Sequence, residues 1–277
     1  MAQIARHRVA LNVLVLLTAL VSGCGGGNSG TPPAAEAPPP VADPPPAPIQ
    51  NVFEPVPTYE SDYEALFSLD SMKTIHIRIS EEEWNGLLND VDHNIRSEVY
   101  RRADFFFGDD VSTAQFVPGV GFRIRGNVFS RKRPEDGSGP HNPTADLVRA
   151  HFKIKFNEKF DEDESAYGPP SRDILEESSY KGRTFRGVRS LNLKFNNNDP
   201  TYMREVFAYD VFRRVGVHTV RQAYTKLYIQ IGGEPERYMG VYLMGEHVDK
   251  SWAKRRFVEN SYLFKCLYQQ FGPADLS

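Results

Sequence analysis

A proline-rich stretch near the N-terminus determines where a compact fold can begin. Nine of the seventeen residues from Pro32 to Pro48 are proline. Proline fixes φ and has no backbone N–H, so such a stretch favours extended polyproline II structure, at about 3.1 Å per residue, over helix or sheet. We expect residues 24–51 to form a disordered linker, which acts as a tether, and residues 52–277 to hold the folded domain.

The composition agrees with one folded region of moderate size. Apolar residues make up 40% of the chain and aromatic residues 12%, enough for a sizeable core. The 33 basic and 36 acidic residues give a formal net charge of -3. A dedicated nucleic-acid binder normally carries a basic domain, so we expect no nucleic-acid partner. The two cysteines cannot build a disulfide scaffold.

The first residues have the pattern of a secretion signal. Basic Arg6 and Arg8 precede an apolar run from Val9 to Val21, which is too short to span a membrane stably. The following Val21-Ser22-Gly23-Cys24 resembles a bacterial lipobox. We therefore predict a lipoprotein signal peptide over residues 1–23 and a lipid on Cys24 that anchors the chain to a membrane. The alternative is a plain secretory signal with an incidental cysteine.

This leader predicts a location in the bacterial cell envelope. Residue 25 is Gly rather than Asp, which by analogy favours the outer membrane where the cell has one.

Hydrophobic alternation predicts an α+β fold in the domain. Ile75, Ile77 and Ile79 share one face of a half-buried strand, and Ser80 with Glu83 forms a capping box that opens a helix. We expect a mainly antiparallel sheet with helices packed on it. The other predicted strands cover residues 103–107, 119–125, 152–156, 190–195, 224–231, 237–244 and 262–266, and the other predicted helices cover residues 201–215 and 250–257.

Self-sufficient catalytic motifs are missing. The histidines are scattered without metal-ligand spacing, and no G-x-S-x-G sequence is present. We assign no metal ligand and no catalytic residue from motifs alone.

An ordered series of short local patterns nevertheless carries a family resemblance. The series contains Val120-Gly121-Phe122-Arg123-Ile124-Arg125-Gly126-Asn127, His151-Phe152-Lys153-Ile154-Lys155-Phe156, Gly187-Val188-Arg189-Ser190-Leu191-Asn192-Leu193-Lys194, Asp199-Pro200-Thr201-Tyr202-Met203-Arg204-Glu205, Ala208-Tyr209-Asp210, Gly240-Val241-Tyr242-Leu243, Glu246, Val248-Asp249-Lys250 and Tyr262-Leu263-Phe264-Lys265. In this order it resembles the CotH (spore-coat protein H) kinase-like family, from about residue 70 onward.

The resemblance implies an ATP-dependent enzyme that phosphorylates Ser or Thr in secreted or envelope proteins. It also implies ATP and Mg²⁺ as cofactors, and a fold like the small lobe of an atypical protein kinase.

Phosphoryl transfer needs a cation on the nucleotide phosphates, and several basic residues are candidates. Lys153 and Lys155 leave the same face of one strand, so one of them reaches a phosphate or both face solvent. Arg123 and Arg125 likewise contact phosphate or form paired surface charges. Arg149 and Ala150 stand at the positions before Phe152 where members of the resembled family often place lysines, so Arg149 is a candidate substitute.

Three acidic residues complete the candidate nucleotide-binding set. Glu205 begins a predicted helix, where it orients a strand cation or only complements the helix dipole. Glu246 and Asp249 follow the last hairpin strand, where the family joins its lobes. Asp249 has the alternative role of capping the next helix.

The main departure from the family concerns the C-terminal lobe, whose catalytic and metal-binding carboxylates come after the segment matching Tyr262–Lys265. The sequence stops at Ser277. From the sequence we therefore expect an N-terminal portion that is inactive in phosphotransfer on its own. The alternative function is a non-catalytic envelope-binding or adhesion lipoprotein.

Overall fold

A computed structural model describes residues 61–126, 130–160, 180–257 and 262–264. Residues from Gln50 to Ser277 form one compact unit, to which the following description is confined. The predicted signal peptide, the linker and Cys24 lie outside the described residues.

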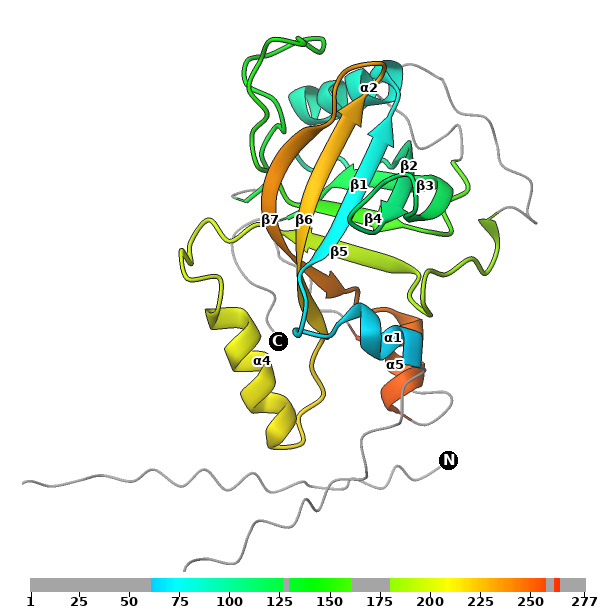
Figure 1. The fold of residues 1–277 in the computed structure, drawn as a ribbon, viewed down its shortest axis with the longest axis vertical. Coiled ribbons are helices and arrows are strands. Elements are labelled where there is room, and N and C mark those ends of the chain that lie inside the picture. Colours follow the sequence, from blue (N-terminus) through cyan, green and yellow to red (C-terminus); the bar gives the residue numbers. More distant parts are fainter. Residues whose placement is uncertain (1–60, 127–129, 161–179, 258–261, 265–277) are drawn as a thin grey trace, which may run out of the picture. The chain divides into compact units, whose positions relative to one another are not determined.

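Seven strands form a closed barrel (Figure 1). The order around the barrel is β1-β2-β3-β4-β5-β7-β6, and β6 returns to β1. The strands are β1 (Lys73–Ile79), β2 (Arg101–Phe107), β3 (Gln115–Ile124), β4 (Phe152–Lys155), β5 (Ser190–Lys194), β6 (Gln222–Ile231) and β7 (Arg237–Glu246). The helices are α1 (Ser61–Leu66), α2 (Glu81–His93), α4 (Arg204–Arg214) and α5 (Lys250–Arg256).

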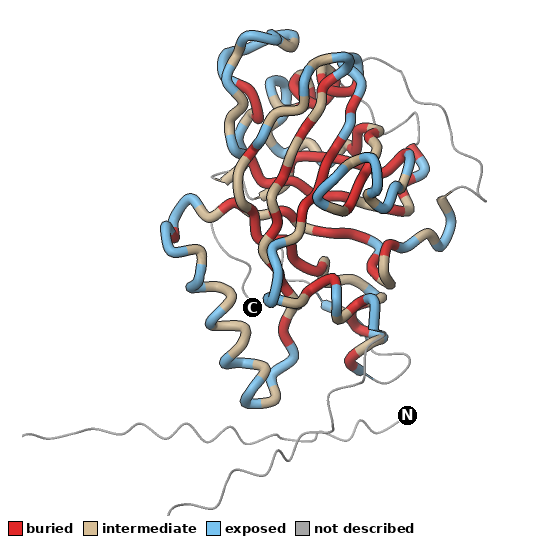
Figure 2. The backbone as a smooth tube through the Cα atoms, viewed as in Figure 1, coloured by how far each residue is buried: buried red, intermediate tan, exposed pale blue. Residues whose placement is uncertain are grey.

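The alternation seen in the sequence fills the barrel. Ile75 and Ile77 on β1 are fully buried, as are Phe105, Phe122 and Leu193 on other strands. Successive side chains of a strand point to opposite faces, so each strand gives one apolar row to the interior and one row to the outside. Figure 2 shows the buried residues concentrated along the strands.

The predicted fold class is wrong, because the sheet closes on itself instead of carrying a layer of helices. Each neighbouring pair of strands is antiparallel except β1 and β6, which run parallel from Lys73↔Thr225 to Ile79↔Ile231. This pairing joins segments about 150 residues apart in sequence. No local pattern records such a contact, because alternation shows which face is apolar and not which edge is paired.

Local predictions were more successful than the fold class. Ser80 caps α2, and its side chain accepts a hydrogen bond from the backbone N–H of Glu83 at 3.1 Å. The strands β6 and β7 form the expected antiparallel hairpin. However, residues 262–264 form no strand, and the rest of that predicted strand lies outside the described residues.

Helix α4 does not pack on the sheet as predicted. None of its residues is buried. The apolar side chains of its N-cap Met203 and of Phe207 and Val211 are 61%, 65% and 39% exposed. By contrast, α1, α2 and α5 each bury at least two residues. Figure 1 shows α4 below the body of the barrel, near the lower ends of β6 and β7.

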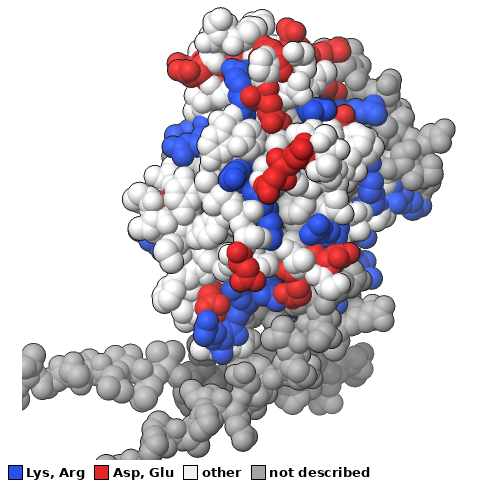
Figure 3. Space-filling model, in the orientation of Figure 1, with Lys and Arg blue, Asp and Glu red and all other residues white. Residues whose placement is uncertain are grey.

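The surface mixes both signs of charge. Basic and acidic side chains are interspersed on the face seen in Figure 3. Within the described part of the chain, no helix is both long and apolar enough to span a bilayer.

A buried ion pair attaches α2 to the barrel and generates a stability prediction. Arg101 on β2 is fully buried and donates two hydrogen bonds to Asp90 on α2, at 2.9 and 2.8 Å. Replacing Asp90 by Ala leaves the guanidinium charge without this partner, so we expect Asp90→Ala to lower the free energy of unfolding by about 3–5 kcal/mol in urea denaturation. Asp92→Ala is the control, because Asp92 lies on the same helix but is partly exposed and pairs with Arg133. We expect the control to cost about 1 kcal/mol or less. Equal losses would contradict this assignment.

Candidate functional site

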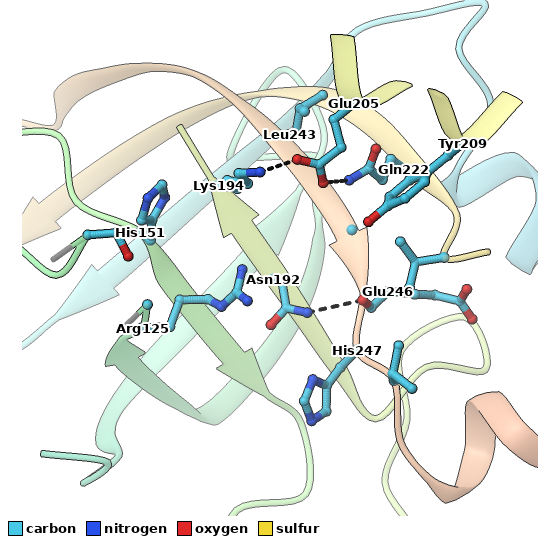
Figure 4. A pocket seen from close by; sticks show the side chains of 15 residues that line it. Arg125, His151, Asn192, Lys194, Glu205, Tyr209, Gln222, Leu243, Glu246 and His247 are labelled. Carbon is cyan, nitrogen blue, oxygen red and sulfur yellow. Dashed lines mark hydrogen bonds and ion pairs between the residues drawn. The ribbon is translucent and has the colours of Figure 1, made fainter. Parts of the chain in front are cut away.

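A hollow of about 640 Å³ lies on the outside of the barrel, where the strands β5, β6 and β7 face α4. Its polar lining is shown in Figure 4 and includes Arg125, His151, Asn192, Lys194, Glu205 and Gln222. These residues come from four strands or strand ends and from one helix.

Strand register assembles a row of outward-facing residues, and one end of this row forms the floor of the hollow. Arg123 pairs with Lys153, Lys153 pairs with Asn192, and Asn192 pairs with Gly245. Gly245 pairs in turn with Gln222, so one row crosses five strands. The residues on either side of Arg123, Lys153 and Asn192 in sequence are buried core residues, so this row faces outward. Residues about 100 apart in sequence thus share one surface.

Glu205 of α4 is held by two strands at once. Its Oε2 accepts a hydrogen bond from the Lys194 ammonium on β5, and its Oε1 accepts one from Gln222 Nε2 on β6 at 2.5 Å (Figure 4). The structure thus places Glu205 against a strand cation, Lys194, and its role in nucleotide binding stays a prediction.

Arg125 brings a positive charge to the hollow that has no direct ion-pair partner among the described residues. Its guanidinium makes no hydrogen bond or ion pair with any residue in the described ranges, and it lines the hollow. Burial lowers the pKa of Arg125, the neighbouring Arg123 charge lowers it further, and the Glu205 carboxylate acts in the opposite direction. A desolvated guanidinium without a carboxylate partner is a strong site for an anion, because its five N–H groups fit carboxylate or phosphate oxygens.

His151 adds an uncharged donor beside this charge. Its Nδ1 accepts a hydrogen bond from the backbone N–H of Phe195 at 3.2 Å, and its ring stacks on the Phe195 ring at 4.5 Å. Burial lowers the pKa of His151 to about 4, and the nearby charges of Arg125 and Lys194 lower it as well. The ring is therefore neutral near pH 7 with its proton on Nε2, and this N–H is available to a ligand in the hollow.

Three of the eight candidate nucleotide-binding residues line the hollow: Arg125, Glu205 and Glu246. Glu246 is already engaged, because its Oε2 accepts hydrogen bonds from Arg256 at 2.6 Å and from the backbone N–H of Arg221 at 3.0 Å. Its carboxylate therefore fixes α5 and the start of β6. A ligand in the hollow would contact the residues around Glu246 and not this carboxylate.

The other basic candidates lie outside the hollow. Arg123 stacks on Tyr100 at 5.0 Å, and Lys155 forms an ion pair with Glu158 at 2.8 Å. Lys153 lies at the border, where its ammonium donates to His247 Nε2 at 3.1 Å.

The remaining two candidates have structural contacts. Arg149 donates to the Tyr202 hydroxyl at 3.2 Å. Asp249 caps α5 by accepting from the backbone N–H groups of Ser251 and Trp252, which is the alternative role that the sequence offered.

The sequence analysis did not select Lys194, His151 or Gln222. A signal existed for Lys194, because it alternates with Leu193 on a predicted strand and shares its outer face with Asn192. No local signal existed for Gln222, since only the β6–β7 register and the position of α4 bring it to Glu205.

The low pKa of His151 predicts a pH-dependent stability. Between about pH 6.5 and pH 4 the unfolded chain binds a proton on His151 that the folded chain does not bind. Stability therefore falls as the pH drops through this window, by about 3 kcal/mol from this residue. We expect the unfolding free energy of the wild type, relative to that of His151→Gln, to decrease by this amount from pH 7 to pH 4. A flat difference across the window would show that His151 is not held neutral.

Comparison with known proteins identifies the family. A family model described as CotH kinase protein matches residues 122–275, which is more than half of the chain. Inner spore coat protein H of Bacillus subtilis (strain 168) is 29% identical over 123 residues, covering 43% of this chain and 32% of that protein. The chain thus spans about a third of the length of this curated relative. The matched range contains the C-terminal end of β3, the strands β4 to β7, α4 and every residue of the hollow named above. The chain therefore belongs to the CotH kinase protein family.

Proposed function

We propose that the hollow binds the phosphates of a nucleoside triphosphate, with ATP as the ligand that the family implies. The observation that carries this proposal is the convergence of Arg125, Lys194 and the His151 Nε2–H on one hollow. Together they supply two cations and one neutral donor, against the carboxylate of Glu205; the other lining carboxylate, that of Glu246, is paired with Arg256. This donor set fits a polyanion, because phosphate oxygens only accept hydrogen bonds and carry negative charge.

The protein residues around the hollow fit the nucleotide better than they fit a metal ion. Among the described residues, no group of His, Cys, Asp and Glu side chains is placed to hold a metal. Glu205 and Glu246 already have cationic partners. The proposal therefore concerns the phosphates, and Mg²⁺ enters only as the ion that accompanies ATP in solution.

The proposed biological role is that of the family, ATP-dependent phosphorylation of Ser or Thr in secreted proteins. The described residues would bind and orient the nucleotide for that reaction. The proposed location is the cell envelope, with a lipid on Cys24 as the anchor. Partition of a Cys24→Ala form with membranes, at the wild-type level, would refute the lipid anchor.

The nucleotide proposal predicts a selective loss of affinity in Arg125→Met. Removing a charge-assisted hydrogen bond costs about 1.5–3 kcal/mol, so we expect Kd for ATP to rise about 10- to 100-fold in isothermal titration calorimetry with Mg²⁺ present. Arg78→Met is the control, because Arg78 lies on β1 over the Phe106 ring, outside the hollow.

Two outcomes would contradict the proposal. Absence of ATP binding by the wild type would favour the non-catalytic envelope-binding alternative. Equal effects of Arg125→Met and Arg78→Met would move the nucleotide away from this hollow. Incorporation of labelled γ-phosphate into a secreted protein is the separate measurement for kinase activity.

A further inference from the structure

Helix α4 forms one wall of the hollow, yet apolar burial does not hold it there. None of its residues is buried, and Phe207 and Val211 on its outer side are exposed. Since a helix in a protein is normally fixed by packing an apolar face, the position of α4 must depend on polar contacts on its inner side. Glu205 makes the contacts on that side that reach two different strands.

Gln222 is the less obvious of the two partners of Glu205. It is the first residue of β6, only 9% exposed, and it pairs with Gly245 on β7. A Cβ atom added at Gly245 would lie 3.5 Å from Gln222 Cγ and 3.8 Å from its Nε2. The Gln222 side chain therefore lies across the glycine, on the floor of the hollow, with its amide directed at α4.

The chemistry of this contact fixes its orientation. A carboxylate can only accept hydrogen bonds, so the nitrogen of the Gln222 amide must face Glu205 Oε1. The ammonium of Lys194 occupies the other oxygen, Oε2. Each oxygen of Glu205 is thus engaged by a different strand, which removes the rotation that a single contact would leave free.

We propose that Gln222 is a positioning residue: its amide holds Glu205 against Lys194 and so keeps both α4 and the Lys194 ammonium in place around the hollow. This inference rests on the proposed function in so far as Lys194 is to meet a phosphate. The part that concerns α4 stands on the contacts alone and can be measured without any nucleotide.

The first test measures α4 in the ligand-free protein by hydrogen exchange. Gln222→Met keeps the length of the side chain and removes the donor, so we expect the α4 amides to exchange about tenfold faster. The melting temperature should change by no more than about 2 °C, because α4 contributes no residue to the core. Gln230→Met is the matched control on the same strand, since its amide donates to the backbone oxygen of Glu234 and not to α4.

A rescue variant tests whether α4 is positioned by the hydrogen-bond donor of Gln222 or only by the volume of its side chain. Gln222→Lys restores a donor of similar reach, and we expect it to return the exchange of α4 toward the wild-type rate. Unchanged α4 exchange in Gln222→Met would overturn the inference, and so would an equal acceleration in Gln230→Met.

The second test is a double-mutant cycle on ATP affinity with Glu205→Ala. We expect Gln222→Met to weaken binding about five- to tenfold in the wild-type background and to have no further effect once Glu205 is gone. Independent, additive losses would show that Gln222 does not act through Glu205. If the wild type fails to bind ATP, the proposed function falls, while the exchange experiment still decides whether Gln222 positions α4.

Discussion

The parallel pairing of β1 with β6 is the constraint on which the rest of the structure depends. It joins Lys73–Ile79 to Thr225–Ile231 along the whole length of β1 and turns the sheet into a closed barrel without free edges. It also gives β6 a hydrogen-bonded neighbour on each side, β1 and β7. Because β6 carries Gln222 and β7 carries Gly245, closure holds the floor of the hollow in a fixed register.

The hollow combines a rigid floor with a lightly attached wall. The floor belongs to a barrel whose interior is filled with apolar side chains, whereas α4 buries none of its residues. Burial of apolar side chains is the main source of stability, so the wall is the part that can move at low cost. The ion pair between Lys194 and Glu205 bridges the two parts and couples the position of α4 to the charge in the hollow.

The sequence analysis predicted the features that neighbouring residues determine. It was wrong about features that depend on contacts between distant segments. Ile75, Ile77 and Ile79 did mark a strand, and Ser80 did cap the next helix, because alternation and capping involve neighbouring residues. The closed barrel was missed because pairing between β1 and β6 depends on edges and not on faces. In the site, three of the predicted nucleotide-binding candidates, Arg125, Glu205 and Glu246, lie at the hollow, whereas Gln222 has no partner within ten residues in sequence that would reveal its role.

The apolar pattern of α4 correctly predicted a helix, but it led to a wrong prediction of how that helix packs. Its apolar residues have helical spacing, and from that spacing an apolar face toward the sheet is the usual inference. In the structure the polar side, with Glu205 and Tyr209, faces the barrel and the hollow instead.

Charged groups of the barrel meet this polar side of α4 at the hollow. Arg125 and Lys194 face the same hollow, and His151 adds no charge because its pKa lies far below neutrality. Glu205 offsets Lys194, so Arg125 leaves one positive charge that no described residue pairs. A hollow with this remaining charge is complementary to an anion, and the polar side of α4 is what keeps Lys194 within its reach.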